Sequence, residues 1–365
     1  DELYIKDAPV SMGAEGYKQV FPDSVWPSDI PGMPPLSIRI IGDFEWDIGD
    51  EASQKDHRNK IEFPHELEIL AGGAFGENMS FFSEIELEHP DEEIEGVGGN
   101  TIVVPETLGF EGWLMWEDLF VKNAFNFKVG NIASREVALP NTRDDDRITK
   151  DHYLYRDKIT GGLNGPGFEV NGFGKIWRYA AGWVKPQDEF GDGSPYVQAS
   201  LKFGGLGYDG SGGTTEEGGL KTTPSGYWRD DSILFGGFYF PGDDNIDRYG
   251  IDARLNYQDL SFAVGYAKED NKTGSDLDQN VWFTELEYFV FPWMQTYVRY
   301  SDFSDDVADK DQSNYIVGMA LLARANVKVN VEGRFYSKNE PAEKATPKRD
   351  KDVNDRVFVR LDFAF

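Results

Sequence analysis

Residues 356–365 have the sequence Arg-Val-Phe-Val-Arg-Leu-Asp-Phe-Ala-Phe, in which apolar and polar side chains alternate. Every second residue from Val357 to Phe365 is Val, Leu or Phe, and Arg360 and Asp362 lie between them. Successive side chains of a β-strand point to opposite faces. The stretch therefore predicts a strand with one apolar face and one polar face.

The same period of two recurs in residues 79–88, 248–257 and 327–335. In these segments and the first one together, none of the 20 residues on the apolar faces is charged, whereas 11 of the 18 on the opposite faces are. Such a separation indicates strands that have one apolar side and one wet side along their whole length.

Composition excludes several other classes. The chain has 365 residues with 36 Lys plus Arg against 65 Asp plus Glu, a net charge of −29 that argues against a nucleic-acid binder. It has no Cys, which excludes disulfides, Cys-ligated zinc and covalently attached c-type haem. The longest stretch without a charge is residues 312–323, shorter than the roughly 18 to 20 residues of a membrane-spanning helix.

Two β-architectures fit the alternation: a soluble sandwich and a barrel in lipid. The polar faces carry both signs of charge, which is typical of a water-filled lumen. Trp and Tyr also recur near the expected strand ends, where membrane barrels carry aromatic girdles, at Trp46, Trp282, Trp293 and Tyr300. Both features favour the membrane barrel.

The predicted fold class is all-β: a single antiparallel transmembrane β-barrel of about 16 strands over residues 36–365, with a periplasmic N-terminal extension over residues 1–35. Six prolines exclude a regular strand or long helix in that extension. Short turns alternate with long connections, and an even strand count puts both barrel ends on the short-turn, periplasmic side. The expected strands are 36–48, 62–75, 79–89, 106–118, 122–132, 167–175, 177–186, 195–205, 231–241, 246–257, 260–269, 280–291, 293–302, 312–323, 326–337 and 354–365.

The ending at Phe365 resembles the last strand of Gram-negative outer-membrane proteins, in which a terminal Phe after alternating apolar residues is recognised by the barrel-assembly machinery. This resemblance implies location in the outer membrane of a Gram-negative bacterium and contact with that machinery.

A second resemblance is to porin-like proteins encoded beside multihaem cytochromes. It is carried by residues 15–17, 34–39, 78–86, 167–172, 202–210 and 229–232. In that group the barrel sheathes a cytochrome so that electrons cross the outer membrane. The resemblance implies a passive, insulating barrel in an electron-transfer complex, with haem only on the partner. Residues 126–130 (Asn-Phe-Lys-Val-Gly) are more distantly similar to phosphate-selective porins.

The period of two places carboxylates inward on the early strands and arginines inward on the late strands. Charges facing each other across a lumen would order water and tune ion passage. Alternatively, the residues fill a wet interior, and cross-strand pairs of opposite sign neutralise one another. The predicted pore-lining residues are Glu66, Glu68, Glu84, Glu86, Glu88, Glu111, Arg248, Arg254, Arg299, Arg334, Arg356 and Arg360.

One connection breaks the pattern, because residues 206–230 should form a short periplasmic turn but are long and rich in Gly. We expect a periplasmic flap that folds under the pore and contacts a partner through Tyr208, Tyr227 and Trp228, since large aromatics dominate interfaces. The alternative is an additional pair of strands.

Other candidate chemistry is weaker. The Asp-rich segments at 144–146, 243–247 and 305–311 are candidate Ca²⁺ loops without EF-hand spacing, and a solvated acidic loop is the alternative for each. The four His residues have no zinc-site spacing, and neither Ser53 with His57 nor Asp151 with His152 lies in a known catalytic context. We therefore expect no enzyme, no catalytic residue, no metal site of the zinc type and no cofactor in this chain.

Two functions remain open. The first is the sheath subunit of a porin–cytochrome conduit, which the resemblance favours. The alternative is a diffusion porin for small solutes or ions with an acidic lumen wall, and homo-oligomers are common among such porins. A co-purifying haem spectrum distinguishes the two.

Overall fold

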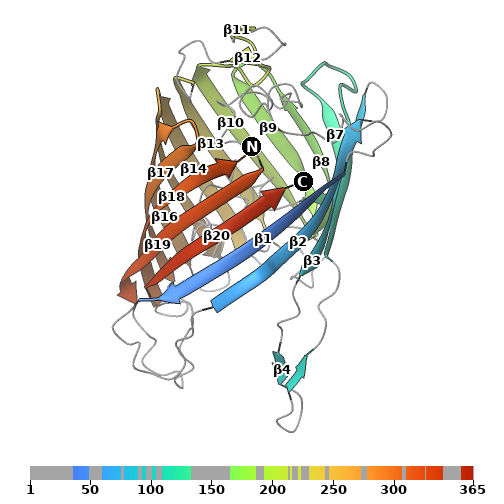
Figure 1. The fold of residues 1–365 in the computed structure, drawn as a ribbon. Helices are drawn as coiled ribbons and strands as arrows, with labels where there is room; N and C mark the ends of the chain where they lie inside the picture. The colour runs from blue at the N-terminus through green and yellow to red at the C-terminus, as the bar shows by residue number, and fades with distance from the viewer. Residues whose placement is uncertain are drawn as a thin grey trace.

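The structure is a computed structural model in which sixteen antiparallel strands form one closed barrel (Figure 1). Among the described residues no helix is long and apolar enough to cross a membrane. The described residues are 36–48, 60–74, 78–88, 93–95, 101–103, 109–132, 165–185, 193–212, 214–215, 221–222, 230–242, 246–272, 278–305, 310–324, 326–339 and 355–364. The predicted N-terminal extension, residues 1–35, lies outside them.

The prediction of about sixteen barrel strands is confirmed. Around the barrel they are β1 (Leu36–Asp47), β2 (Lys60–Ala74), β3 (Met79–Glu88), β6 (Gly109–Trp116), β7 (Asn126–Ile132), β8 (Gly165–Phe173), β9 (Trp177–Val184), β10 (Ser194–Gly204), β13 (Ser232–Pro241), β14 (Ile246–Tyr257), β15 (Leu260–Asn271), β16 (Gln279–Phe291), β17 (Met294–Asp305), β18 (Lys310–Arg324), β19 (Val327–Asn339) and β20 (Arg356–Ala364).

Two short hairpins stand apart from the barrel sheet. β4 (Glu93–Glu95) pairs with β5 (Thr101–Val103), and β11 (Thr214–Thr215) pairs with β12 (Lys221–Thr222). Within the described part of residues 206–230, the alternative of an additional strand pair is met only by a hairpin of two-residue strands that does not join the barrel.

The two rims of the barrel differ. The two-residue turns of β14–β15, β16–β17 and β18–β19 lie on the rim where β1 starts and β20 ends, at the top of Figure 1. We call this the tight-turn rim. The β4–β5 hairpin extends from the opposite rim. The β11–β12 hairpin stands over the tight-turn rim, so the long β10–β13 connection is on the side that the sequence predicts.

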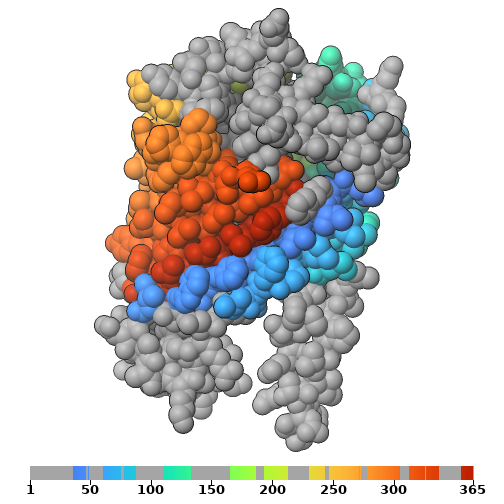
Figure 2. Space-filling view, in the orientation of Figure 1, coloured from blue at the N-terminus to red at the C-terminus, as the bar shows by residue number. Residues whose placement is uncertain are grey.

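Closure joins the first and last strands. β1 pairs with β20 from Arg39↔Ala364 to Asp47↔Arg356, and the two lie side by side across the surface in Figure 2. This seam removes the free edges of the sheet, whose unpaired backbone groups would each cost several kcal/mol in hydrocarbon.

Burial is inverted relative to a soluble protein. On β10, the outward side chains of Val197, Leu201 and Phe203 are exposed, whereas the inward side chains of Gln198 and Lys202 are buried. Outward Ile251 on β14 is 69% exposed. Exposed apolar side chains on the outer face are stable only in lipid, so the chain is a transmembrane β-barrel and the sandwich alternative is excluded.

The first prediction concerns this outer face. Ile251 lies outward at the middle of β14, opposite Gly237 and Tyr266. Replacing it with Arg should lower the free energy of unfolding by about 2 to 4 kcal/mol, the cost expected near the bilayer midplane. The measurement is a urea titration of protein refolded into phospholipid vesicles.

The matched control is Glu111→Arg, which adds the same side chain to the inward face of β6, next to Glu84. It should cost much less, because the new charge meets carboxylates instead of hydrocarbon. Equal losses for the two variants would contradict the assignment of the faces.

Candidate functional site: the inward face of the barrel

The strand register sets three pairs of acidic residues directly opposite each other on the inward face. The register sets Glu66 against Glu88 and Glu68 against Glu86, between β2 and β3. It also sets Glu84 against Glu111, between β3 and β6. Like charges directly opposite on neighbouring strands destabilise a sheet. We call these six residues the acidic wall; they are the six carboxylates that the sequence predicts to face inward.

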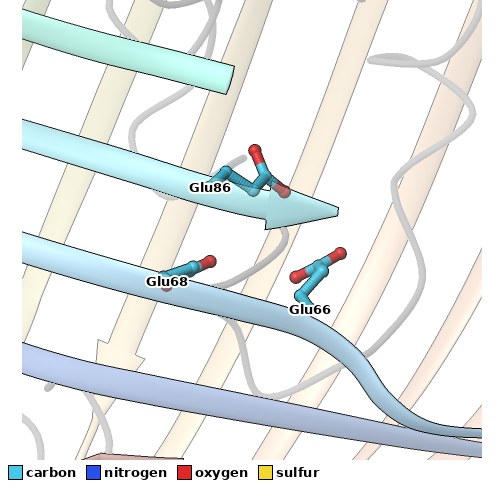
Figure 3. A group of neighbouring side chains, drawn as sticks. All are labelled: Glu66, Glu68 and Glu86. Atoms are coloured by element: carbon cyan, nitrogen blue, oxygen red, sulfur yellow. The ribbon is translucent and has the colours of Figure 1, made fainter. Parts of the chain in front are cut away.

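The acidic wall includes a compact cluster. Carboxylate oxygens of Glu66, Glu68 and Glu86 all lie within 4.8 Å of one another. Figure 3 shows Glu66 and Glu68 on β2 and Glu86 on the neighbouring β3, all on one face of the sheet. Glu68 is buried, and Arg39 Nη1 lies 3.4 Å from its Oε2. Glu66 and Glu86 are partly exposed.

Oxygen ligands at this spacing are those that Ca²⁺ and Mg²⁺ prefer, so the cluster is the one group of carboxylates in the described residues with the chemistry for a hard cation. Of the Asp-rich segments, residues 144–146, 243–245 and 306–309 lie outside the described residues, and nothing tests the Ca²⁺ binding considered for them. His57, His89 and His152 also lie outside, whereas His65 lies on β2 with Nδ1 2.9 Å from Glu62.

Most of the predicted inward arginines lie against carboxylates of adjacent strands. The N–O distances are 2.7 Å for Arg299 with Glu285 and 2.7 Å for Arg248 with Glu269. Arg356 lies 2.6 Å from Glu45. This arrangement favours the second sequence hypothesis for these residues, in which cross-strand pairs neutralise the wall.

The last two predicted arginines have other surroundings. Arg334 donates to the Tyr336 hydroxyl at 2.9 Å, and its guanidinium lies 5.6 Å from the ring centre of Phe358. Arg254 lies inward on β14, two residues from Asp252 on the same face of the strand. The structure thus places all twelve predicted residues on the inward face by register, although Glu88 is placed by its backbone only. That they line a conducting pore stays a prediction.

The closing seam is held by charged pairs that the sequence analysis missed. Arg39 donates to both oxygens of Asp362, at 2.9 and 2.7 Å, and Lys328 Nζ lies 3.1 Å from the same carboxylate. Arg360 donates to both oxygens of Asp43, at 2.9 and 3.0 Å. Two-point guanidinium–carboxylate bonds fix geometry as well as energy. Arg360 is therefore a seam residue as well as an inward charge.

Several large inward side chains lie flat against the wall. A Cβ on Gly265 would come within 2.4 Å of the Phe283 ring, and one on Gly318 within 2.3 Å of Tyr297. The missing side chains make room for the rings along the sheet. The Tyr297 hydroxyl then donates to Glu332 Oε2 at 2.8 Å. Large residues on these strands consequently project less toward the barrel axis.

The β10–β13 connection is clasped at its base. Asp230 is fully buried; Lys202 Nζ lies 2.7 Å from its Oδ2, and Leu206 N donates to the same oxygen at 2.8 Å. Gly205 permits this approach, because its φ is +57° and a Cβ there would meet the Asp230 carboxylate. The clasp holds the two ends of the connection together.

The connection enters on the inward side. The Tyr208 hydroxyl lies 3.0 Å from Ser200 Oγ, which faces inward on β10, and Tyr208 N donates to Lys175 O in the β8–β9 turn. The position of Tyr208 agrees with a segment that folds toward the pore mouth. Tyr227 and Trp228 lie outside the described residues, and contact of any of the three with a partner stays a prediction.

Comparison with known proteins gives the class of the fold. No family model matches the chain. No curated protein sequence matches it either. Among solved structures, OmpF of Salmonella typhi in complex with daunomycin aligns with a TM-score of 0.53 at 11% identity, covering 90% of this chain and 97% of that one.

Two further structures agree. A triple mutant of the Rhodopseudomonas blastica porin aligns at a TM-score of 0.51 and 14% identity, covering 90% of this chain and 100% of that one. OmpT of Vibrio cholerae aligns at 0.51 and 11% identity, covering 90% and 97%. Identities this low establish the fold alone. The chain has the fold of a porin-type outer-membrane β-barrel.

The second prediction concerns the seam. Replacing Arg360 with Met removes both hydrogen bonds to the buried Asp43 carboxylate. Breaking a buried pair from one side typically costs about 3 to 5 kcal/mol. We expect a loss of that order in the free energy of unfolding, measured by tryptophan fluorescence in urea.

The control removes the other charge as well. The double variant Asp43→Leu with Arg360→Met leaves no buried carboxylate, so it should recover a large part of the loss. If Arg360→Met alone unfolds at the same urea concentration as the natural chain, the pair does not stabilise closure.

Proposed function

We propose that this chain is an outer-membrane porin through which small hydrophilic solutes diffuse, and that it favours cations over anions. The acidic wall is the observation that carries the proposal. By register, six acidic residues belong to the inward face as three directly opposed pairs, an arrangement that lowers sheet stability. Because this arrangement lowers stability, its presence in a folded chain indicates a role other than stability. Its direct consequence is a negative electrostatic potential that attracts cations.

The remainder of the inward face strengthens this argument. The arginines at 248, 299, 356 and 360 lie against carboxylates of neighbouring strands, so their charges are largely neutralised locally. Local pairing reduces the positive contribution of these arginines to the field in the lumen, to which the acidic wall contributes negative charge. A cavity lined by one sign of charge with low-dielectric walls concentrates counter-ions and raises their rate of entry.

The strand number favours diffusion over the sheath function that the sequence resemblance implies. Barrels of 16 to 18 strands typically leave an aqueous channel, whereas those that enclose a folded plug have about 22. The sixteen strands found here fit the first group. The sheath of a multihaem cytochrome conduit stays an alternative, supported by the resemblance of the sequence segments.

Location and assembly follow the same proposal. The fold is shared with the outer-membrane protein OmpT of Vibrio cholerae and with the porin of Rhodopseudomonas blastica, and the chain would reach the outer membrane through the barrel-assembly machinery. Homo-oligomers are part of the proposal, as is the lack of any enzymatic activity or bound cofactor. The predicted recognition element, Phe365, lies outside the described residues.

Selectivity provides the third prediction. Replacing Glu66, Glu86 and Glu111 together with Gln keeps side-chain size and removes three partly exposed inward charges. In planar bilayers with a salt gradient, the reversal potential should shift toward that of a less cation-selective pore. The conductance should remain, because no side chain grows.

A matched control changes the same charge outside the lumen wall. Asp209, Asp231 and Asp259 lie at the tight-turn rim. Their replacement with Asn should leave the reversal potential in molar salt nearly unchanged, because charges at the exposed rim are strongly screened at that ionic strength. If both triple variants shift it equally, the acidic wall does not set selectivity.

A fourth prediction separates the two functions. Protein purified from its native membrane should be colourless and should conduct ohmically in planar bilayers. A haem Soret band that co-purifies in fixed stoichiometry, together with a closed lumen, would support the sheath instead.

A further inference from the structure

A surface-exposed apolar triplet lies on the tight-turn rim, in the turn between β6 and β7. Leu119, Phe120 and Val121 follow one another, and Phe120 is 80% exposed. The turn stands at the upper rim of Figure 1. Neither the barrel core nor the inward face uses these side chains. Exposed consecutive apolar residues outside the strands indicate a surface that something else covers.

The turn has an ordered backbone that keeps the triplet exposed. Leu119 N donates to Phe125 O at 3.0 Å, and Ala124 N donates to Val121 O at 3.0 Å. Asp118 and Asn123 adopt positive φ, and Asn123 N donates to the Asp118 carboxylate. Residues with short polar side chains take up this conformation most readily. Specific hydrogen bonds therefore hold the turn in this shape.

Its position is on the outer side of the barrel. The Tyr179 hydroxyl, on the outward face of β9, donates to Ala124 O at 3.0 Å. Gly172 lies outward on β8, and a Cβ there would come within 2.2 Å of the same oxygen. The absence of a side chain at Gly172 lets the turn rest directly on the outer wall. The triplet is thus presented to the surroundings of the barrel and not to its lumen.

The depth along the barrel axis identifies the occupant. The turn lies beside the last outward aromatics of its neighbours: the rings of Trp116 and Phe127 are 6.0 Å apart, and those of Trp177 and Tyr179 are 5.9 Å apart. Aromatic residues at strand ends mark the level of the lipid headgroups. Lys122 is exposed in the same turn and can direct its ammonium group to lipid phosphate while its methylenes stay at the apolar level.

We propose that Leu119, Phe120 and Val121 form a membrane anchor that inserts into the headgroup region of the leaflet at the tight-turn rim, with Lys122 at the lipid phosphates. The occupant is a phospholipid surface. The anchor would fix the height of the β6–β9 side of the barrel in the bilayer, and it is independent of what passes through the lumen.

The chain has no Cys, so single-cysteine variants can be spin-labelled without background. Phe120→Cys and Val121→Cys are reconstituted in vesicles of phosphatidylethanolamine and phosphatidylglycerol. Collision rates of the label with oxygen, which concentrates in lipid, and with a water-soluble nickel complex then report its depth. Ile251→Cys on the outer wall is the lipid reference, and Asp209→Cys in the β10–β13 connection is the water reference.

The anchor predicts an oxygen-to-nickel ratio at 120 and 121 several-fold above that of the label at 209 and below that of the label at 251. A ratio equal to that at 209 would overturn the proposal, because the turn would then lie in water. Low collision rates with both reagents would overturn it as well, since a second copy of the chain or another protein would then cover the triplet.

Discussion

The hydrocarbon of a bilayer offers no partner for a backbone N–H or C=O group, and the whole architecture follows from that constraint. A sheet of sixteen strands satisfies it only by pairing β1 with β20, whose residues are more than 300 positions apart in the chain. Bidentate bonds of Arg39 to Asp362 and of Arg360 to Asp43 lie at this seam, on its inward side. Charged pairs there serve closure without meeting lipid.

The inward face thus has two kinds of charge. At the seam and on the late strands, arginines and carboxylates of neighbouring strands lie within 3 Å and hold adjacent strands in register. On β2, β3 and β6, carboxylates instead oppose carboxylates, which weakens the sheet locally. The first kind explains how a barrel with so acidic a composition remains closed. The second kind contributes negative charge to the lumen, which is the basis of the cation preference that we propose.

Period-two alternation was sufficient to predict the fold, because the two faces of a strand in a membrane barrel differ so sharply. The strand register could not be predicted in the same way, because no local feature of the sequence indicates that Arg360 pairs with Asp43 and not with Glu66. The expected strand 122–132 begins only at Asn126, because the turn that contains Asp118 and Asn123 at positive φ continues to Phe125. The length of the β10–β13 connection was visible, but its buried Lys202–Asp230 clasp was not.

The central claim is that a closed barrel turns an acidic wall toward open water. It is tested most directly on β3, by replacing residues 79–87 with Cys one at a time in a chain that has no other Cys, and by treating reconstituted vesicles with a membrane-impermeant thiol reagent. The account predicts strict alternation: labelling at 80, 82, 84 and 86, and none at 79, 81, 83, 85 and 87. Labelling without a period of two would contradict the strand register, and protection of both sets would mean that the acidic wall is covered instead of open.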